Sequence, residues 1–301
     1  MSVRITNFGL DAVAQVDATS SSPFPYFHKW SRYTAIGTGT TPPAQTDTAL
    51  ASEVARTDSN GGFSHTEQYV RDSTNNKLRA VITEYRVFNF TTSYNLTEYG
   101  HFTQSTGANC VFRDLFRQDP NDPNSTPVVI SVQSGDQLQI IKTVVIEVPW
   151  LETTYSITIT GMAGKDGNGT HDVVGTAFAV DSPTYIIHAF WALWPGGPPL
   201  TIQAVNDPGG SSARDAAVFL PGNGGGMAMD AYTNGTYTRT KRYTFPTSAA
   251  NGNIYAFVIS ITTGTWWAYS GYKMFFQNPS SITKASTHTL EMVFQMTWGR
   301  G

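Results

Sequence analysis

The sequence predicts an all-β protein that is built from antiparallel β-sandwich domains with at most one or two short helices. Many short segments alternate apolar and polar residues with a period of two, and Gly, Pro and Asn residues separate these segments. Helical periodicity, in contrast, is nearly absent. Aromatic residues make up 13% of the chain, far more than disordered chains carry, so we expect packed cores.

The strands of the first half follow this alternation. Lys77 to Asn89 is rich in Val, Ile, Tyr and Phe and is expected to form one long strand. Thr126 to Val132 and Gln137 to Val148 are expected to form two more strands. The Ser-Gly-Asp turn at 134–136 has hairpin chemistry, because Gly tolerates a positive φ angle, so it is expected to join these two strands.

Two short helices are candidates. Thr46 to Val54 is the weaker one, with Thr46 or Asp47 as its N-cap and its apolar residues on one face. Ser211 to Phe219 is the second. The polar residues 1–12 are interpreted as an arm or as a first strand.

A candidate domain boundary lies at Pro149 to Glu152, between the long strand before it and a new series of predicted strands in the second half. This boundary predicts two domains, an N-terminal β-sandwich at 1–150 and a β-rich domain at 151–301 with long Gly/Pro loops and a final strand at 287–298. The strands expected in the second domain are Tyr155–Met162, Asp172–Val180, Thr184–Leu193, Leu200–Val205, Tyr237–Phe245, Ile254–Thr262, Trp266–Phe276 and Thr287–Trp298.

The charge balance argues against nucleic acid and membrane partners. The net charge is −3, and charged residues make up 14% of the chain, against about 25% in an average globular protein. No block of Lys and Arg residues offers a nucleic-acid groove. The longest apolar run, Tyr185 to Trp194, is too short to cross a bilayer, and the first twenty residues lack the apolar core of a signal peptide.

Cys110 is the single cysteine of the chain. It has no partner for an intrachain disulfide or a cysteine-based zinc site. Its apolar surroundings predict a small, buried and unreactive side chain. A protein of this kind is expected to assemble in a reducing cytoplasm.

Five segments resemble a family of tailed-bacteriophage virion proteins that are described as tail or fibre-associated. They are Ile36 to Pro43 followed by Thr46 to Leu50, then Leu96 to Phe102, Cys110 to Phe116, a hairpin at Val128 to Ile146, and the C-terminal Lys284 to Arg300. The resemblance implies a structural component of the virion, in the tail, fibre base, neck or capsid surface, that is assembled in the host bacterial cytoplasm. It implies other virion proteins as partners and a homo-oligomer.

The sequence carries no motif of the common enzyme classes, and no enzyme, cofactor or metal is expected. His171 lies near acidic residues with a weak likeness to a calcium loop, but the glycine and the bidentate glutamate are not in place. A tail depolymerase is the lower alternative, and it would need two carboxylates about 5–10 Å apart across a cleft. The candidate carboxylates sit in predicted strands: Glu84, Glu98, Asp114 and Glu147.

Aromatic residues of the second half are the candidate contacts for a partner subunit or a glycan: Trp191, Trp194, Trp266, Trp267, Tyr269 and Tyr272. Packing between two sheets is the plainer interpretation. Trp266 and Trp267 cannot both enter one core, because neighbouring strand residues face opposite sides, and we favour a subunit contact. The alternative function is a carbohydrate-binding or host-receptor-recognition protein of the tail, for which these aromatics would stack on a host surface glycan.

Overall fold

The all-β prediction is confirmed by the structure, a computed structural model. It describes residues 5–15, 29–149, 153–160, 169–179, 201–207, 218–219, 226–260, 270–276 and 281–300. Within these ranges, twenty strands accompany a single full helix, α1 (Asn7–Gln15), and every strand pairing is antiparallel.

The first nine strands form three sheets, with the orders β2-β1-β6-β7, β3-β4-β9 and β5-β8. The long strand predicted at Lys77 to Asn89 is β4. The strands are β1 (Tyr33–Gly37), β2 (Glu53–Thr57), β3 (Thr66–Asp72), β4 (Lys77–Asn89), β5 (Tyr94–Leu96), β6 (Glu98–Phe102), β7 (Cys110–Leu115), β8 (Ile130–Val132) and β9 (Gln137–Pro149).

One apolar cluster joins these three sheets. Ile36 of β1, Phe88 of β4 and Val132 of β8 are buried together in it, so each sheet turns one face toward the others. Along β4, every second side chain from Leu78 to Arg86 is buried, and the residues between are half-buried on the opposite face. The period-two pattern therefore marks an inner and an outer face of the sheet.

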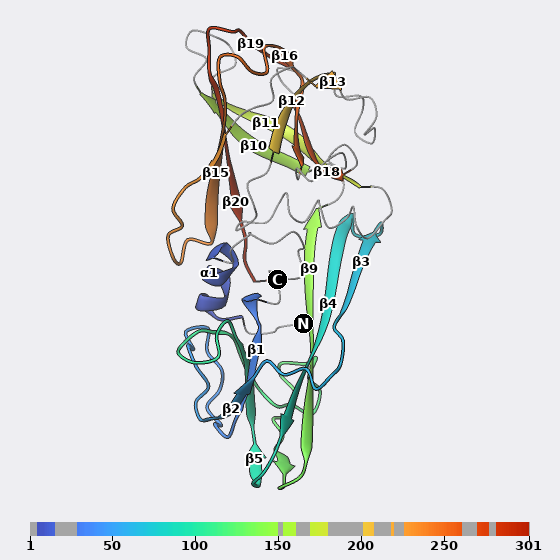
Figure 1. The fold of residues 1–301 in the computed structure, drawn as a ribbon, viewed down its shortest axis with the longest axis vertical. Coiled ribbons are helices and arrows are strands. Elements are labelled where there is room, and N and C mark those ends of the chain that lie inside the picture. Colours follow the sequence, from blue (N-terminus) through green and yellow to red (C-terminus); the bar gives the residue numbers. More distant parts are fainter. Residues whose placement is uncertain are drawn as a thin grey trace.

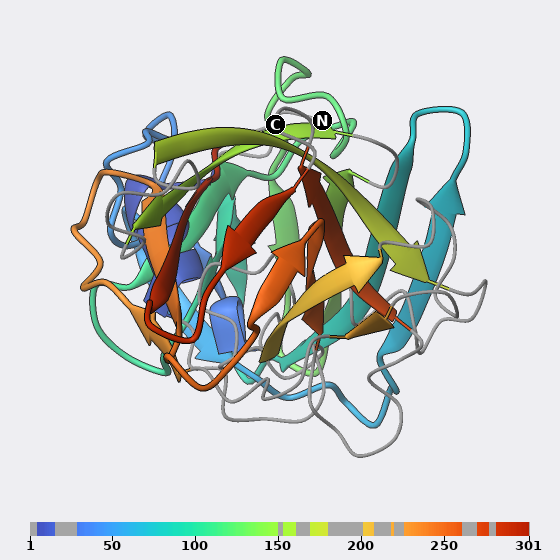
Figure 2. The same cartoon turned by 90° about the horizontal axis from the view of Figure 1, so that it is seen from above.

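The remaining strands form a nine-stranded sheet with the order β13-β12-β17-β18-β11-β10-β20-β15-β14, together with the pair β16-β19. The large sheet curves strongly when it is viewed down the long axis (Figure 2). The strands are β10 (Thr153–Thr160), β11 (Gly169–Ala179), β12 (Thr201–Asp207), β13 (Val218–Phe219), β14 (Gly226–Met229), β15 (Thr238–Phe245), β16 (Gly252–Ile254), β17 (Ala256–Ser260), β18 (Ser270–Phe276), β19 (Ile282–Lys284) and β20 (Leu290–Thr297).

Aromatic rings fill the inside of the large sheet. Phe257 of β17 is fully buried, and its ring centroid lies 5.9 Å from that of Phe245 and 5.6 Å from that of Phe276. These rings come from β15, β17 and β18. Large aromatic side chains bury more apolar area than any others, so they account for much of the stability of this core.

No sheet of the described residues combines strands from both sides of the predicted boundary, because β9 ends at Pro149 and β10 begins at Thr153. The two sets of strands occupy opposite ends of the long axis (Figure 1). Whether each set folds alone stays a prediction. The expected strand Thr184–Leu193 and most of the Gly/Pro loops lie outside the described residues.

Helix α1 joins the two sets of strands (Figure 1). Its inner face packs on β7, where Ala12 is buried in a cluster with Phe112. From the other side, the carboxylate of Asp11 accepts hydrogen bonds from the Tyr232 hydroxyl at 2.6 Å and the Gly235 N–H at 2.7 Å. The indole N–H of Trp298 donates to the Leu10 carbonyl at 2.8 Å. Residues 5–15 therefore form a packed joint, and the interpretation of the N-terminus as an arm or strand is wrong.

Two further predictions are wrong. Residues 46–52 form turns and loop, and Val54 lies in β2, so Thr46 to Val54 is not a helix. The strands on either side of the 134–136 turn do not pair with each other: β8 pairs with β5, and β9 pairs with β4. The turn is hydrogen-bonded to Phe90 instead. The Phe90 N–H donates to the Asp136 carbonyl, and the Phe90 carbonyl accepts the N–H of Gly135. Of the second helix candidate, residues 218–219 form β13 and the rest lies outside the described residues.

Candidate functional site

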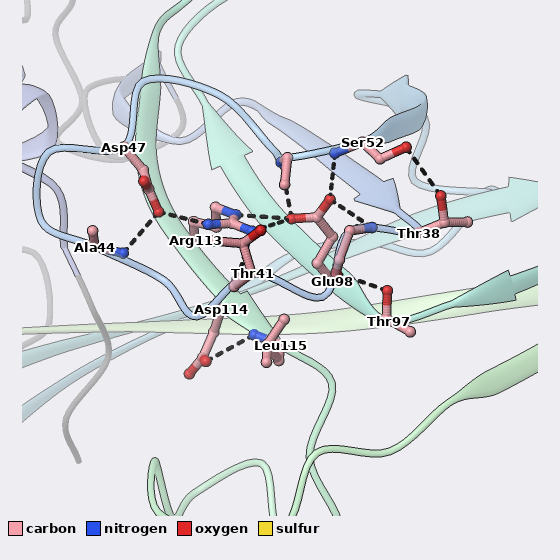
Figure 3. Close-up of polar contacts among 12 residues, drawn as sticks. Thr38, Thr41, Ala44, Asp47, Ser52, Thr97, Glu98, Arg113, Asp114 and Leu115 are labelled. Carbon is pink, nitrogen blue, oxygen red and sulfur yellow. Dashed lines mark hydrogen bonds and ion pairs between the residues drawn. The ribbon is translucent and has the colours of Figure 1, made fainter.

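The loop between β1 and β2, residues 38–52, packs over a buried carboxylate. We call this loop the motif loop, because it contains most of the first segment of the family resemblance. The side chain of Glu98 on β6 has no exposed surface. Its Oε1 atom accepts the N–H groups of Gly39 at 3.0 Å and Ser52 at 2.7 Å, and its Oε2 atom accepts the N–H of Ala51 at 3.1 Å. One carboxylate thus ties together both ends of the loop (Figure 3).

Arg113 on β7 supplies the countercharge and reaches the middle of the loop. Its Nε and Nη2 atoms lie 2.8 and 2.7 Å from Glu98 Oε2, and its Nη1 atom donates to Asp47 at 2.8 Å. Its Nη2 atom also donates to the Thr41 carbonyl at 2.9 Å. Burial lowers the pKa of this guanidinium, but the hydrogen bonds to Asp47 and Glu98 outweigh burial and raise it. The guanidinium therefore stays charged.

The two glycines of the motif make room for this carboxylate. A Cβ atom on Gly37 would lie 2.7 Å from Glu98 Oε1, and one on Gly39 would lie 2.6 Å from the Cβ atom of Ala51 and closer still to Glu98 Oε1. Both distances are below van der Waals contact. The Ile-Gly-Thr-Gly pattern is therefore explained by the close approach of the backbone to a buried charge.

The outer surface of the motif loop is exposed and carries no charge apart from the half-buried Asp47, which is paired. Its exposed residues are Thr40, Thr41, Pro42, Ala44, Gln45, Thr46, Thr48, Ala49, Ala51 and Ser52. The Glu98, Arg113 and Asp47 side chains beneath the loop are all engaged in hydrogen bonds and ion pairs. The exposed side of the loop therefore presents hydroxyl, amide and methyl groups, which suit contact with another surface.

A second buried ion cluster lies between the two larger sheets of the first half. Glu84 of β4 pairs with Lys142 of β9 and with Arg86, and Lys142 also donates to the carbonyl and hydroxyl oxygens of Ser31. Burial lowers the pKa of Lys142 to about 8, although the Glu84 carboxylate opposes this. Burial, with Lys142 and Arg86, also holds the pKa of His101 well below its usual range.

The four candidate carboxylates of a depolymerase are each paired with cations. Glu84 and Glu98 belong to the two buried clusters described above. Asp114 lies 3.0 Å from Arg117 Nη2, and Glu147 lies 2.6 Å from Lys77 Nζ. The structure thus gives each of these carboxylates a cationic partner on its own strand, on a neighbouring strand or, for Asp114, just beyond the end of its strand.

The aromatic residues predicted as contacts are largely beyond the described part of the chain. Trp191, Trp194, Trp266, Trp267 and Tyr269 lie outside it. Tyr272 lies in β18, where its backbone is in register with Ala177 of β11 and Ile259 of β17. The subunit-contact interpretation of these residues stays a prediction.

Two tryptophans that were not among the predicted contact residues bond to the helix α1. Trp30 donates its indole N–H to the Gly9 carbonyl at 2.7 Å, and Trp298 donates to Leu10. Both therefore fasten α1. The Trp-x-Arg ending was the available signal, because Arg300 donates to the Ile5 carbonyl and to the Asn7 side chain.

Cys110 is fully buried, and burial raises the pKa of its thiol to about 12, as expected of an unreactive core residue. His171 is buried on β11 and packs edge-on against Phe276, while Asp166 and Asn168 of the calcium-like segment lie outside the described residues. Among the residues that the structure describes, no group of three or more His, Cys, Asp or Glu side chains is arranged to hold a metal ion. No helix in the described ranges is long and apolar enough to cross a membrane.

Comparison with known proteins gives no further assignment: no family model, curated protein or solved structure matches this chain.

Proposed function

We propose that this chain is a non-enzymatic structural component of a tailed-bacteriophage particle that works through contacts between protein surfaces. The motif loop is the observation that carries the proposal. Three backbone N–H groups and the Arg113 guanidinium converge on the Glu98 carboxylate, so the exposed loop above is held in one conformation. A loop that is ordered before it binds loses little conformational entropy in an assembly contact.

The resemblance to virion proteins supports the same function from the sequence, because its first segment is the motif loop and two others supply Glu98 and Arg113. The partners of the loop would be other virion proteins or further copies of the chain. The position in the particle, whether tail, fibre base, neck or capsid surface, is a finer proposal that rests on the resemblance alone.

The first test is the composition of purified particles from the phage whose genome encodes the chain. We expect mass spectrometry to find the chain at a stoichiometric copy number, and immunogold labelling to place it at one site of the particle. Absence of the chain from intact particles would overturn the proposal.

The second test places a charge on the motif loop. Thr46→Arg adds a cation at an exposed position, so the variant should fold and yet be lost from particles. Asn121→Arg, in the exposed loop between β7 and β8, is the matched control and should be incorporated normally. Equal incorporation of both variants would show that the motif loop is not the contact.

Incubation of the purified chain with host surface polysaccharide separates the alternatives. Release of reducing ends would establish a depolymerase and overturn the non-enzymatic proposal. Binding without cleavage would establish a glycan-recognition role for the particle component.

A further inference from the structure

Exposed apolar side chains gather on one face of the first half. Seven large hydrophobic side chains are exposed in the described part of the chain, and four of them lie on the outer face of the β3-β4-β9 sheet or beside it. Ile141 is 59% exposed, Val70 and Phe63 are each 46% exposed, and Val145 is 39% exposed. We call this surface, with the half-buried Val81 and Tyr85 and the threonines between them, the outer face.

The strand register arranges the outer face in rows across the sheet. Val81 pairs with Val145, Thr83 pairs with Thr143, and Tyr85 pairs with Ile141. The Phe63 ring packs on Tyr85 with centroids 5.4 Å apart, which extends the last row. On β4 and β9, a threonine row therefore lies between one row of Val81 and Val145 and another of Tyr85 and Ile141, while β3 adds Gln68 to the first of these rows.

The charges of the outer face are confined to one end and balance each other. Glu147 pairs with Lys77 at 2.6 Å and with Arg79 at 3.1 Å, and Asp72 stands opposite Lys77 in the strand register. Two acids and two bases sum to zero. A neutral apolar surface with its charges at one edge is the usual composition of a protein interface, which has an apolar centre and a polar rim.

We propose that the outer face is a two-fold interface between two copies of this chain, an inference that rests on the assembly function proposed above. The proposed two-fold axis lies in the plane of the interface, runs perpendicular to the strands and follows the threonine row. Rotation about it places Val145 over the partner's Ile141 and Thr143 over the partner's Thr143. The same axis sends the charged ends of the two copies to opposite ends of the interface, so like charges do not meet. A parallel stacking would bring Lys77 and Arg79 of both copies together and is disfavoured.

The small area of the outer face limits the affinity that we expect for the dimer. Three strands about 4.8 Å apart and seven residues long present roughly 350 Å² per copy. Stable dimers bury about 800 Å² per partner, so we expect a weak dimer that forms at high protein concentration or in a particle that holds many copies.

Sedimentation velocity of the full chain over a concentration range tests the proposal. We expect a concentration-dependent dimer, and Ile141→Lys should raise the concentration at half-dimerisation at least about tenfold because it buries a charge in each copy. Val129→Lys is the matched control, because Val129 is 58% exposed but lies off the outer face, and it should dimerise like the parent chain. Circular dichroism checks that both variants fold.

A short bismaleimide cross-linker tests the symmetry directly. Thr143→Cys places a thiol on the axis and should give a covalent dimer, whereas Ser131→Cys, exposed on β8, should not. The native Cys110 is fully buried and should not compete. Equal cross-linking of the two variants, or dimerisation of Ile141→Lys like the parent chain, would overturn the proposal.

A chain that stays monomeric at every concentration would also overturn the two-copy interface. If the chain is nevertheless found in particles and Ile141→Lys is excluded from them, the outer face binds a different virion protein. The proposed function would then stand without this inference.

Discussion

Glu98 and Arg113 form a buried ion pair in which carboxylate Oε2 and guanidinium Nη2 lie 2.7 Å apart beneath the motif loop. Removal of the Glu98 charge leaves the buried Arg113 guanidinium with the half-buried Asp47 carboxylate in place of two countercharges, and it sets an amide group among the backbone N–H donors of the loop. Glu98→Gln should therefore lower the free energy of unfolding by about 3–5 kcal/mol, measured by urea denaturation. Asp58→Asn, which breaks the exposed pair with Arg32, is the control and should cost about 0–1 kcal/mol. Similar losses in both variants would show that the buried pair has no special role.

Gly39→Ala tests the close approach of the loop to the carboxylate. The added methyl group would overlap Glu98 Oε1, so the loop must move and its hydrogen bonds must lengthen. We expect a loss of about 1–3 kcal/mol in unfolding free energy. Gly299→Ala, where no atom lies within 4 Å of the new methyl group, should leave the unfolding free energy unchanged. A neutral Gly39→Ala would contradict the packing described for the motif.

Asp11→Ala tests the joint at α1. The substitution leaves the Tyr232 hydroxyl and the Gly235 N–H without their acceptor, which should cost about 1–3 kcal/mol. Hydrogen exchange followed by mass spectrometry should show faster exchange in α1 and around residue 235. Asp58→Ala removes the exposed pair with Arg32 and serves as the control. Unchanged exchange in α1 would mean that the bonds of Asp11 add little to the packing on β7 and to the hydrogen bonds from Trp30 and Trp298.

His101 should make the protein sensitive to acid. Because burial holds the pKa of His101 well below 6.5, the unfolded chain binds a proton as pH falls through 6.5 while the folded chain does not. Stability is therefore lost toward acid, at up to about 1.4 kcal/mol per pH unit below 6.5. Urea midpoints at pH 7 and pH 5 measure the difference, which His101→Asn should reduce.

The control for this measurement is His65→Asn, because the His65 side chain is 46% exposed. It should leave the difference between pH 7 and pH 5 as large as in the parent chain. An equal reduction in both variants would assign the acid sensitivity to groups other than His101.

Cys110 should resist alkylation in the folded protein. Its thiol is fully buried, and burial raises its pKa to about 12, so almost no thiolate is present or accessible at pH 8. We expect iodoacetamide to modify Cys110 in urea and not in buffer, as followed by intact mass. The Ser131→Cys variant shows that the reagent is active on an exposed thiol, and rapid modification of the parent chain in buffer would contradict the burial of Cys110.

Local patterns predicted the strands well where alternation and burial agreed. Lys77 to Asn89 was delimited as β4 because alternate residues face the core along its whole length. The partner of each strand was harder to predict. The Ser-Gly-Asp turn has the chemistry of a hairpin, yet it bonds to Phe90, and β9 returns to β4 across 137 to 149. Turn residues set a local bend, and packing of distant residues selects the partner.

The candidate site was likewise predictable in its local sequence pattern and not in its long-range contacts. The motif loop was visible in the sequence, but Glu98 and Arg113 meet beneath it because β6 and β7 are paired side by side, with Gly100 opposite Arg113. Helix α1 was missed because its main local signal is Thr6, whose hydroxyl accepts the N–H of Gly9, and Thr is as common in strands. Its burial against β7 and the C-terminal segment provides the rest of its stability.

The joint at α1 sets an order of events during synthesis. The Leu10 carbonyl cannot accept its hydrogen bond from the Trp298 indole until Trp298, 288 residues further along the chain, has been synthesised. The contacts of α1 with the C-terminal segment therefore form after its contacts with β7 become available, so this helix couples the folding of early and late parts of the chain.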